Sequence, residues 1–169
     1  MGTIHLQKIA VLPLDQGLLN QAVGFFNAAS RCFGNVAISP IVHNSPMTPG
    51  IVCAAFSIEL YLKLLHFLAS GVAPRGHKLG ELFDSLALKE RQRIAEKYGS
   101  NDVSAHITEV SAAFMDWRYE HEHEALNINP DALMAIATAC HLAAREMNPK
   151  LTVFGENSVA LQVERISEA

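Results

Sequence analysis

The chain has 169 residues, of which 50% are hydrophobic and 18% are charged, a balance typical of one globular domain with a continuous apolar core. Its formal net charge of -4 gives no general attraction for nucleic-acid phosphates, and no long basic run supplies one locally. The three cysteines are far apart among small or apolar neighbours, which argues against a disulfide framework and favours a cytoplasmic location.

The chain is predicted to open with an extended lead, one helix and a long loop. Residues 4–13 are compatible with one edge strand, and this start shows neither a secretion signal nor a myristoylation motif. The run LLNQAVGFFNAASRCF, residues 18–33, has apolar side chains at helical spacing. Residues 34–50 carry three of the seven prolines, so we expect a loop there.

Residues 49–71 are predicted to form the central helix of a bundle. Thr48 and Pro49 suit its start and Gly71 suits its end. Most of its side chains are apolar, and the few polar ones fall on one narrow stripe: Glu59, Lys63, His66 and Ser70. Charges in this stripe would be costly in hydrocarbon, so we expect a buried helix and no membrane span. The stripe either meets solvent or lines a polar site.

Three shorter helical segments follow. Arg75 belongs to a turn after which His77 could cap a helix over residues 78–86, or bind a phosphate together with Arg75. Residues 89–99 form a charged helical segment that ends at Gly99. The next helix follows three capping residues, and its core-facing positions are Val103, Ile107, Val110, Phe114 and Trp117.

The last predicted helix runs from Pro130, capped by Asn129, to Met147. Three of its polar residues share a face with Asp131, as either a polar wall or an outer surface: Thr138, His141 and Arg145. Residues 150–169 form a tail with a short strand near residues 152–154, which leaves residues 1–149 as a single helical domain.

Between these helices, residues 114–124 read FMDWRYEHEHE. Several side chains of this stretch are usable metal ligands: Glu120, His121, Glu122, His123 and Glu124. Histidines two positions apart do not share a helical face, and no cysteine pair supports them. The alternative is a solvated acidic helix end, and we therefore assign no metal.

The region spanning residues 49–147 resembles HEPN domains, which are helical bundles found beside minimal nucleotidyltransferases and in prokaryotic toxins. The motifs that carry the resemblance are ELYLK and RGHKL, both within residues 54–86, and FMDWRYEHE after them. The resemblance implies an all-α, up-and-down bundle of four or five helices that commonly dimerises, here with irregular N- and C-terminal extensions. It also implies a homodimer, and a relation to toxin-antitoxin systems.

Two functions follow from this resemblance. The first is a ligand- or partner-binding module without a cofactor, which binds a nucleotide or a nucleotidyltransferase chain in a polar groove between the helices at residues 49–71 and 130–147. The residues assigned to this binding are Glu59, Lys63, His66, Arg75, His77, His141 and Arg145. The alternative is a metal-independent endoribonuclease acting on RNA, since many HEPN proteins pair an arginine with a histidine a few residues later.

Arg118 and His123 fit that arginine–histidine pattern. Histidine can move the proton of a ribose 2′-hydroxyl, and arginine can stabilise the charge on the phosphate in the transition state. The neighbouring glutamates would repel a polyanion and raise the pKa of the histidine.

Overall fold

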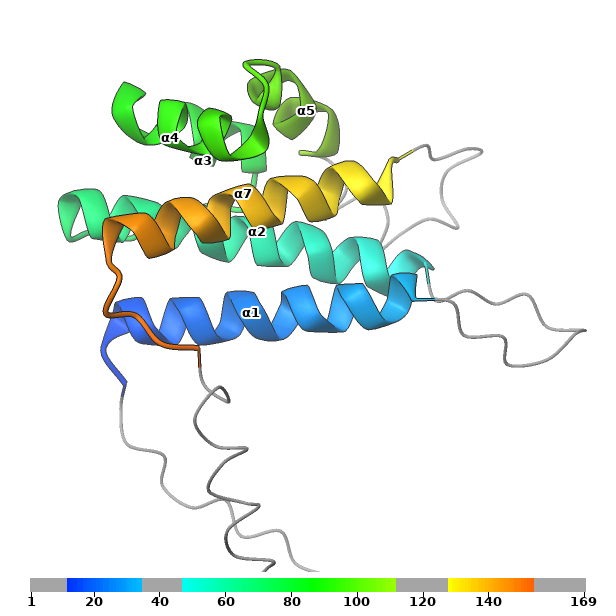
Figure 1. Cartoon of the computed structure of the whole chain (residues 1–169), viewed down its shortest axis with the longest axis horizontal. Coiled ribbons are helices and arrows are strands. Elements are labelled where there is room, and N and C mark those ends of the chain that lie inside the picture. Colours follow the sequence, from blue (N-terminus) through cyan, green and yellow to red (C-terminus); the bar gives the residue numbers. More distant parts are fainter. Residues whose placement is uncertain (1–11, 35–46, 112–127, 154–169) are drawn as a thin grey trace, which may run out of the picture.

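The computed structural model describes residues 12–34, 47–111 and 128–153 of the chain. Within these ranges all regular secondary structure is helical and there is no strand (Figure 1). The helices are α1 (Leu14–Phe33), α2 (Met47–Ser70), α3 (Leu79–Asp84), α4 (Leu88–Tyr98), α5 (Val103–Val110) and α7 (Pro130–Met147). The predicted all-α class is therefore confirmed as a helical bundle.

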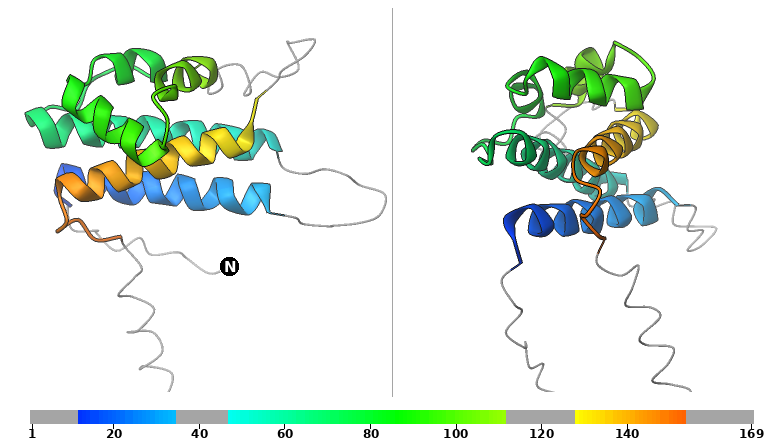
Figure 2. Two further views of the ribbon diagram at one scale, coloured as in Figure 1. Left: turned by 45° about the horizontal axis from the view of Figure 1, so that its top comes forward. Right: turned by 60° about the vertical axis from the view of Figure 1, so that its left-hand side comes forward.

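The described helices form three layers (Figures 1 and 2). α1 lies on one face, α2 and α7 lie side by side in the middle, and α3, α4 and α5 cover the opposite face. α2 runs antiparallel to α1, whereas α7 runs in the same direction as α2 (Figure 1). As the sequence predicted, the most apolar helix occupies the interior.

Several helix ends follow from local chemistry. Asn129 caps α7 through its side-chain oxygen, which accepts hydrogen bonds from the backbone N–H groups of Asp131 at 2.9 Å and Ala132 at 3.2 Å. Pro130 occupies the first helical position, where its missing N–H is not needed. α4 ends at Gly99, whose φ of +83° is the left-handed conformation that glycine adopts without strain.

Other predicted boundaries were wrong by a few residues. α2 begins at Met47, so Thr48 and Pro49 lie inside its first turn. α3 is shorter than residues 78–86, and its N-cap is Lys78 rather than His77. Thr152 and Val153 are not in a strand, and neither are Leu12 and Pro13 at the end of the predicted edge strand. The remaining residues of both predicted strands lie outside the described ranges.

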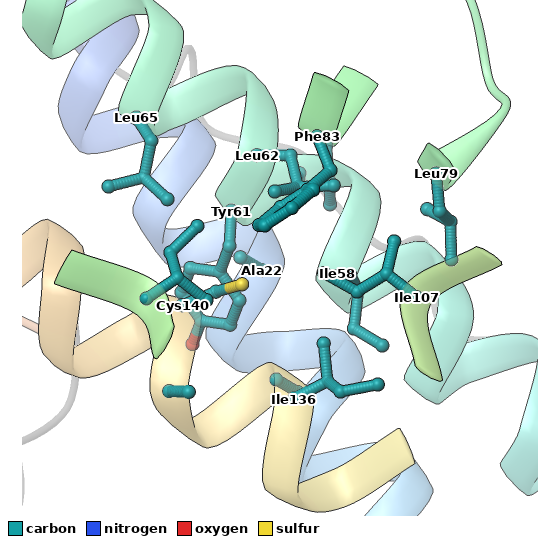
Figure 3. Close-up of a cluster of buried hydrophobic side chains, with 14 of the residues drawn as sticks. Ala22, Ile58, Tyr61, Leu62, Leu65, Leu79, Phe83, Ile107, Ile136 and Cys140 are labelled. Carbon is teal, nitrogen blue, oxygen red and sulfur yellow. The ribbon is translucent and has the colours of Figure 1, made fainter. Parts of the chain in front are cut away.

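The core is continuous across the layers (Figure 3). On one side, Gly50 allows α2 to approach α1, because a Cβ at this position would lie 2.6 Å from Cε1 of Phe33 and 2.9 Å from Cβ of Cys32. On the other side, Figure 3 shows Tyr61 and Ile58 of α2 lying near Cys140 and Ile136 of α7. Val103, Ile107 and Val110 of α5 are buried as predicted.

Among the described helices, α2 is the one whose length and composition would allow it to cross a membrane. Its most apolar window is 61% buried inside the protein. Buried core helices commonly pass such a test, so its apolar character is explained by packing and is only weak support for a membrane span.

Candidate functional site

The polar stripe of α2 is covered by the segment that follows the helix. Glu59 is 1% exposed, and its Oε1 accepts a hydrogen bond from Nζ of Lys63 at 2.8 Å. The same Oε1 lies 3.0 Å from Nδ1 of His77, which must donate this bond because a carboxylate can only accept. Three residues of the stripe and His77 therefore form a polar cluster around the buried Glu59, which we call the α2 seam: Glu59, Lys63, His66 and His77.

A glycine turn brings His77 to this position. α2 ends where Gly71, with a φ of +76°, donates its N–H to the carbonyl of Phe67 at 2.7 Å. Gly76, with a φ of +110°, lies directly before His77. The chain thus reverses and returns along the polar face of α2, and Cβ-bearing residues at either glycine would be strained.

His66 joins the seam to α3. Its Nε2 lies 2.9 Å from the carbonyl oxygen of Leu82 and 3.0 Å from Oγ of Ser85. Since the carbonyl accepts, Nε2 carries the hydrogen of that bond. His66 therefore attaches α2 to the end of α3, and its ring is already engaged in the structure.

The structure does not bring the two expected walls of a groove together. His141 lies on α7, where its Nδ1 is 3.1 Å from the hydroxyl of Tyr61. Tyr61 is two positions after Glu59, which places the two side chains about 200° apart around the helix. Arg145 is half-buried one turn beyond His141. The α2 seam and the polar residues of α7 thus lie on different sides of α2, with apolar packing between the helices (Figure 3).

Two groups at this apolar contact are held in their neutral forms. Burial raises the pKa of Tyr61 well above its ordinary value, and the neighbouring Cys140 raises it further. Burial also raises the pKa of the Cys140 thiol to about 12, so it is not a nucleophile at neutral pH. This side of α2 is structural in character.

The α2 seam differs because one oxygen of its buried carboxylate is unsatisfied. Glu59 Oε2 is buried and has no hydrogen-bond partner among the described residues. Arg75 is exposed two residues before His77 in the same segment. The seam therefore has a buried acceptor, and an exposed guanidinium lies two residues from the histidine that contacts the same carboxylate; once the acceptor is uncovered, these groups can bind a ligand with a donor group and an anionic group.

Sequence reasoning missed two polar residues within the apolar part of α2. Oγ of Ser57 donates a hydrogen bond to the carbonyl of Ala22 in α1 at 2.8 Å, and Tyr61 bonds to His141. Both side chains are buried and lie outside the polar stripe. Their place on the apolar face was the signal in the sequence that could have revealed them. A polar residue on the apolar face of a core helix needs a partner from a neighbouring helix.

The residues of the ribonuclease hypothesis, Arg118 and His123, lie outside the described ranges, and so does the whole acidic stretch at residues 114–124. Within the described part of the chain, no group of three or more His, Cys, Asp or Glu residues is placed to hold a metal ion. The ribonuclease activity stays a prediction. Chelator-resistant RNA cleavage that His123→Ala abolishes would support it, and cleavage abolished by chelator would favour a metal instead.

Comparison with known proteins found no matching family model, no matching curated protein and no matching solved structure.

Proposed function

We propose that this protein is a HEPN-like up-and-down bundle that acts in the cytoplasm as a homodimer and binds a nucleotide or a partner nucleotidyltransferase. The layered all-helical arrangement around one apolar central helix supports this proposal. So do the motifs ELYLK and RGHKL, because they supply the two sides of the α2 seam. The proposed binding surface is the α2 seam together with Arg75.

The unsatisfied oxygen of Glu59 carries this proposal. Oε1 accepts from Lys63 and His77, whereas the buried Oε2 has no donor among the described residues. A buried acceptor without a donor costs about 1–3 kcal/mol, which a ligand donor would offset when the side chains that cover Oε2 move aside on binding. The amino groups and ribose hydroxyls of nucleotides are such donors, as are the amide groups of a protein partner.

Arg75 gives the same surface a cation for phosphate. It is exposed, whereas the nearby Lys78 is already paired with Glu81 at 2.8 Å. A guanidinium presents two parallel N–H groups that match phosphate oxygens. A bound nucleotide would place a donor of its base or sugar at Glu59 and its phosphate at Arg75.

Isothermal titration calorimetry with a panel of purine and pyrimidine nucleotides tests this function. We expect Glu59→Gln and Arg75→Ala each to weaken binding at least about tenfold, the loss typical of one charge-assisted hydrogen bond. Glu81→Gln is the matched control, because Glu81 is an exposed glutamate paired only with Lys78 among the described residues. Nucleotide binding that Glu59→Gln and Arg75→Ala leave unchanged would exclude this surface.

The alternative that the chain binds a partner nucleotidyltransferase needs its own experiment. If no nucleotide binds, the chain is coexpressed with a minimal nucleotidyltransferase, and copurification is compared between the unmodified chain and Arg75→Ala. A complex that the substitution weakens would support the proposal, and no complex would exclude it. Sedimentation velocity tests the homodimer, which a monomer at micromolar concentration would contradict.

A further inference from the structure

A groove lies between α3, α4 and the start of α5, away from the α2 seam. Its volume is about 180 Å³, and a wider hollow of about 520 Å³ along α4 shares Gln92, Ala95 and Asn101 with it. Phe83, Leu88 and Val103 form its apolar walls. Gln92, Asn101 and Ser104 add amide and hydroxyl groups, and Ala95 and Arg91 complete the lining.

Arg91 is the unusual member of this groove. Its Nε is buried, and within the described part of the chain it has no hydrogen-bond partner and the side chain has no ion pair. Arg93, two positions later, bonds to Glu146 at 2.9 Å and so has the counter-ion that Arg91 lacks. The guanidinium of Arg91 therefore has no carboxylate to neutralise it within the described part of the chain.

The chemistry of this groove is that of a carboxylate site. We propose that it binds a small organic monocarboxylate with an apolar tail, whose oxygens accept from the Nη–H groups of Arg91, which lines the groove. The apolar walls fit the tail, and Leu88, which is 61% exposed, gains contact when the tail covers it. The side-chain amides of Gln92 and Asn101 supply further donors at the polar edge.

The surrounding charge favours a single negative charge on the ligand. Glu96 lines the adjoining hollow together with Gln92 and Asn101. A dianion such as a phosphate monoester would meet this carboxylate with only one arginine in compensation, whereas a monocarboxylate is neutralised by Arg91 alone. This site is independent of the nucleotide or partner binding proposed for the α2 seam.

Nuclear magnetic resonance titration of the full chain with sodium hexanoate tests this proposal. We expect saturable shifts of the Arg91 Nε–H and of the side-chain amides of Gln92 and Asn101, with a Kd on the order of millimolar for so small a ligand. Hexanol, which has the same tail without the charge, and hexylphosphonate, which carries a second charge, should both bind more weakly. Tighter binding of either would overturn the assignment of a carboxylate.

Substitutions test whether Arg91 is responsible for the binding of hexanoate. Arg91→Met should weaken hexanoate binding at least about tenfold, and Arg91→Lys should also weaken it, since lysine keeps the charge but lacks the planar donor edge. Arg31→Met removes an exposed arginine from α1 and should leave the Kd unchanged. If Arg91→Met does not fold, Arg91→Lys decides the result. Unchanged binding in the Arg91 variant, or no saturable shift in the groove, would overturn the proposal.

Discussion

The α2 seam and the groove beside α4 each contain a buried atom of a charged side chain, but the two charges are compensated to different degrees. Glu59 is bonded to Lys63 from its own helix and to His77 from the segment after it. Arg91 has no ion pair among the described residues. A buried charge contributes to folding only when it is paired. Glu59 should therefore stabilise the fold without any ligand, whereas Arg91 should not.

The largest expected effect comes from removing the carboxylate of Glu59. Glu59→Met should lower the free energy of unfolding by about 3 kcal/mol, the lower end of the range for breaking a buried ion pair. The lower end applies because Lys63 is still 15% exposed and can turn toward water. Urea unfolding followed by circular dichroism measures the change. Glu81→Met, which removes an exposed partner of Lys78, should change stability little.

The double variant Glu59→Met/Lys63→Met sharpens this test. It removes the buried carboxylate and its partly exposed lysine partner, and leaves His77, whose side chain is 67% exposed and can be solvated. Most of the lost stability should then return, because replacing a buried pair by apolar side chains is often neutral or favourable. A double variant no more stable than Glu59→Met would show that the ion pair is not the source of the effect.

A smaller effect is expected on the other side of α2, where the polar contact is neutral. Tyr61→Phe removes the hydroxyl that lies 3.1 Å from Nδ1 of His141 and should cost about 1 kcal/mol, the typical net value of one hydrogen bond. Tyr98→Phe is the control, since its hydroxyl makes an equivalent bond to His106 at 2.7 Å but in a more exposed place. Equal losses in the two variants would contradict a role for burial.

The sequence predicted the fold class and the central helix because both depend on local patterns. The spacing of apolar residues located α2, α5 and α7, and Asn129 with Pro130 marked the start of α7. The stripe containing Glu59 and Lys63 was also visible at helical spacing. What covers the stripe was not visible, since it depends on the path of the chain after Gly71.

The same limit explains what sequence reasoning missed around Arg91. Its position three residues before Ile94, which is fully buried, places it on the inner face of α4. That pattern shows burial but not the absence of a partner, because partners such as Glu146 come from a helix more than fifty residues later. Glu146 forms an ion pair with Arg93 but not with Arg91. Pairing of charges is thus a property of packing between helices.

Arg91→Met should have an effect opposite in sign to that of Glu59→Met. Without ligand, the free energy of unfolding should stay unchanged or rise by roughly 0.5 kcal/mol, because the substitution removes a buried donor that has no acceptor among the described residues. Urea unfolding under the conditions used for Glu59→Met provides the comparison. A decrease in the free energy of unfolding of more than about 1 kcal/mol would mean that Arg91 has a structural partner. The charged groups of the groove and of the α2 seam would then both be compensated within the protein.

The smallest effect concerns how α4, which carries Arg91, is attached to α7. Hydrogen bonds from Lys97 at 2.6 Å and Arg93 at 2.9 Å lower the pKa of Glu146 below its ordinary value of 4.5. A carboxyl whose pKa is lower in the folded state contributes stability above its ordinary pKa and loses it as the pH falls through the lowered value.

Glu146→Gln should therefore reduce the melting temperature slightly at neutral pH, and the difference from the unmodified protein should disappear as the pH falls below 4.5. Because Glu146 is largely solvated, added salt should also shrink the difference at neutral pH. Differential scanning calorimetry across this pH range measures both. A difference that persists in acid and in high salt would show that Glu146 acts through packing, and the attachment of α4 would then not depend on charge.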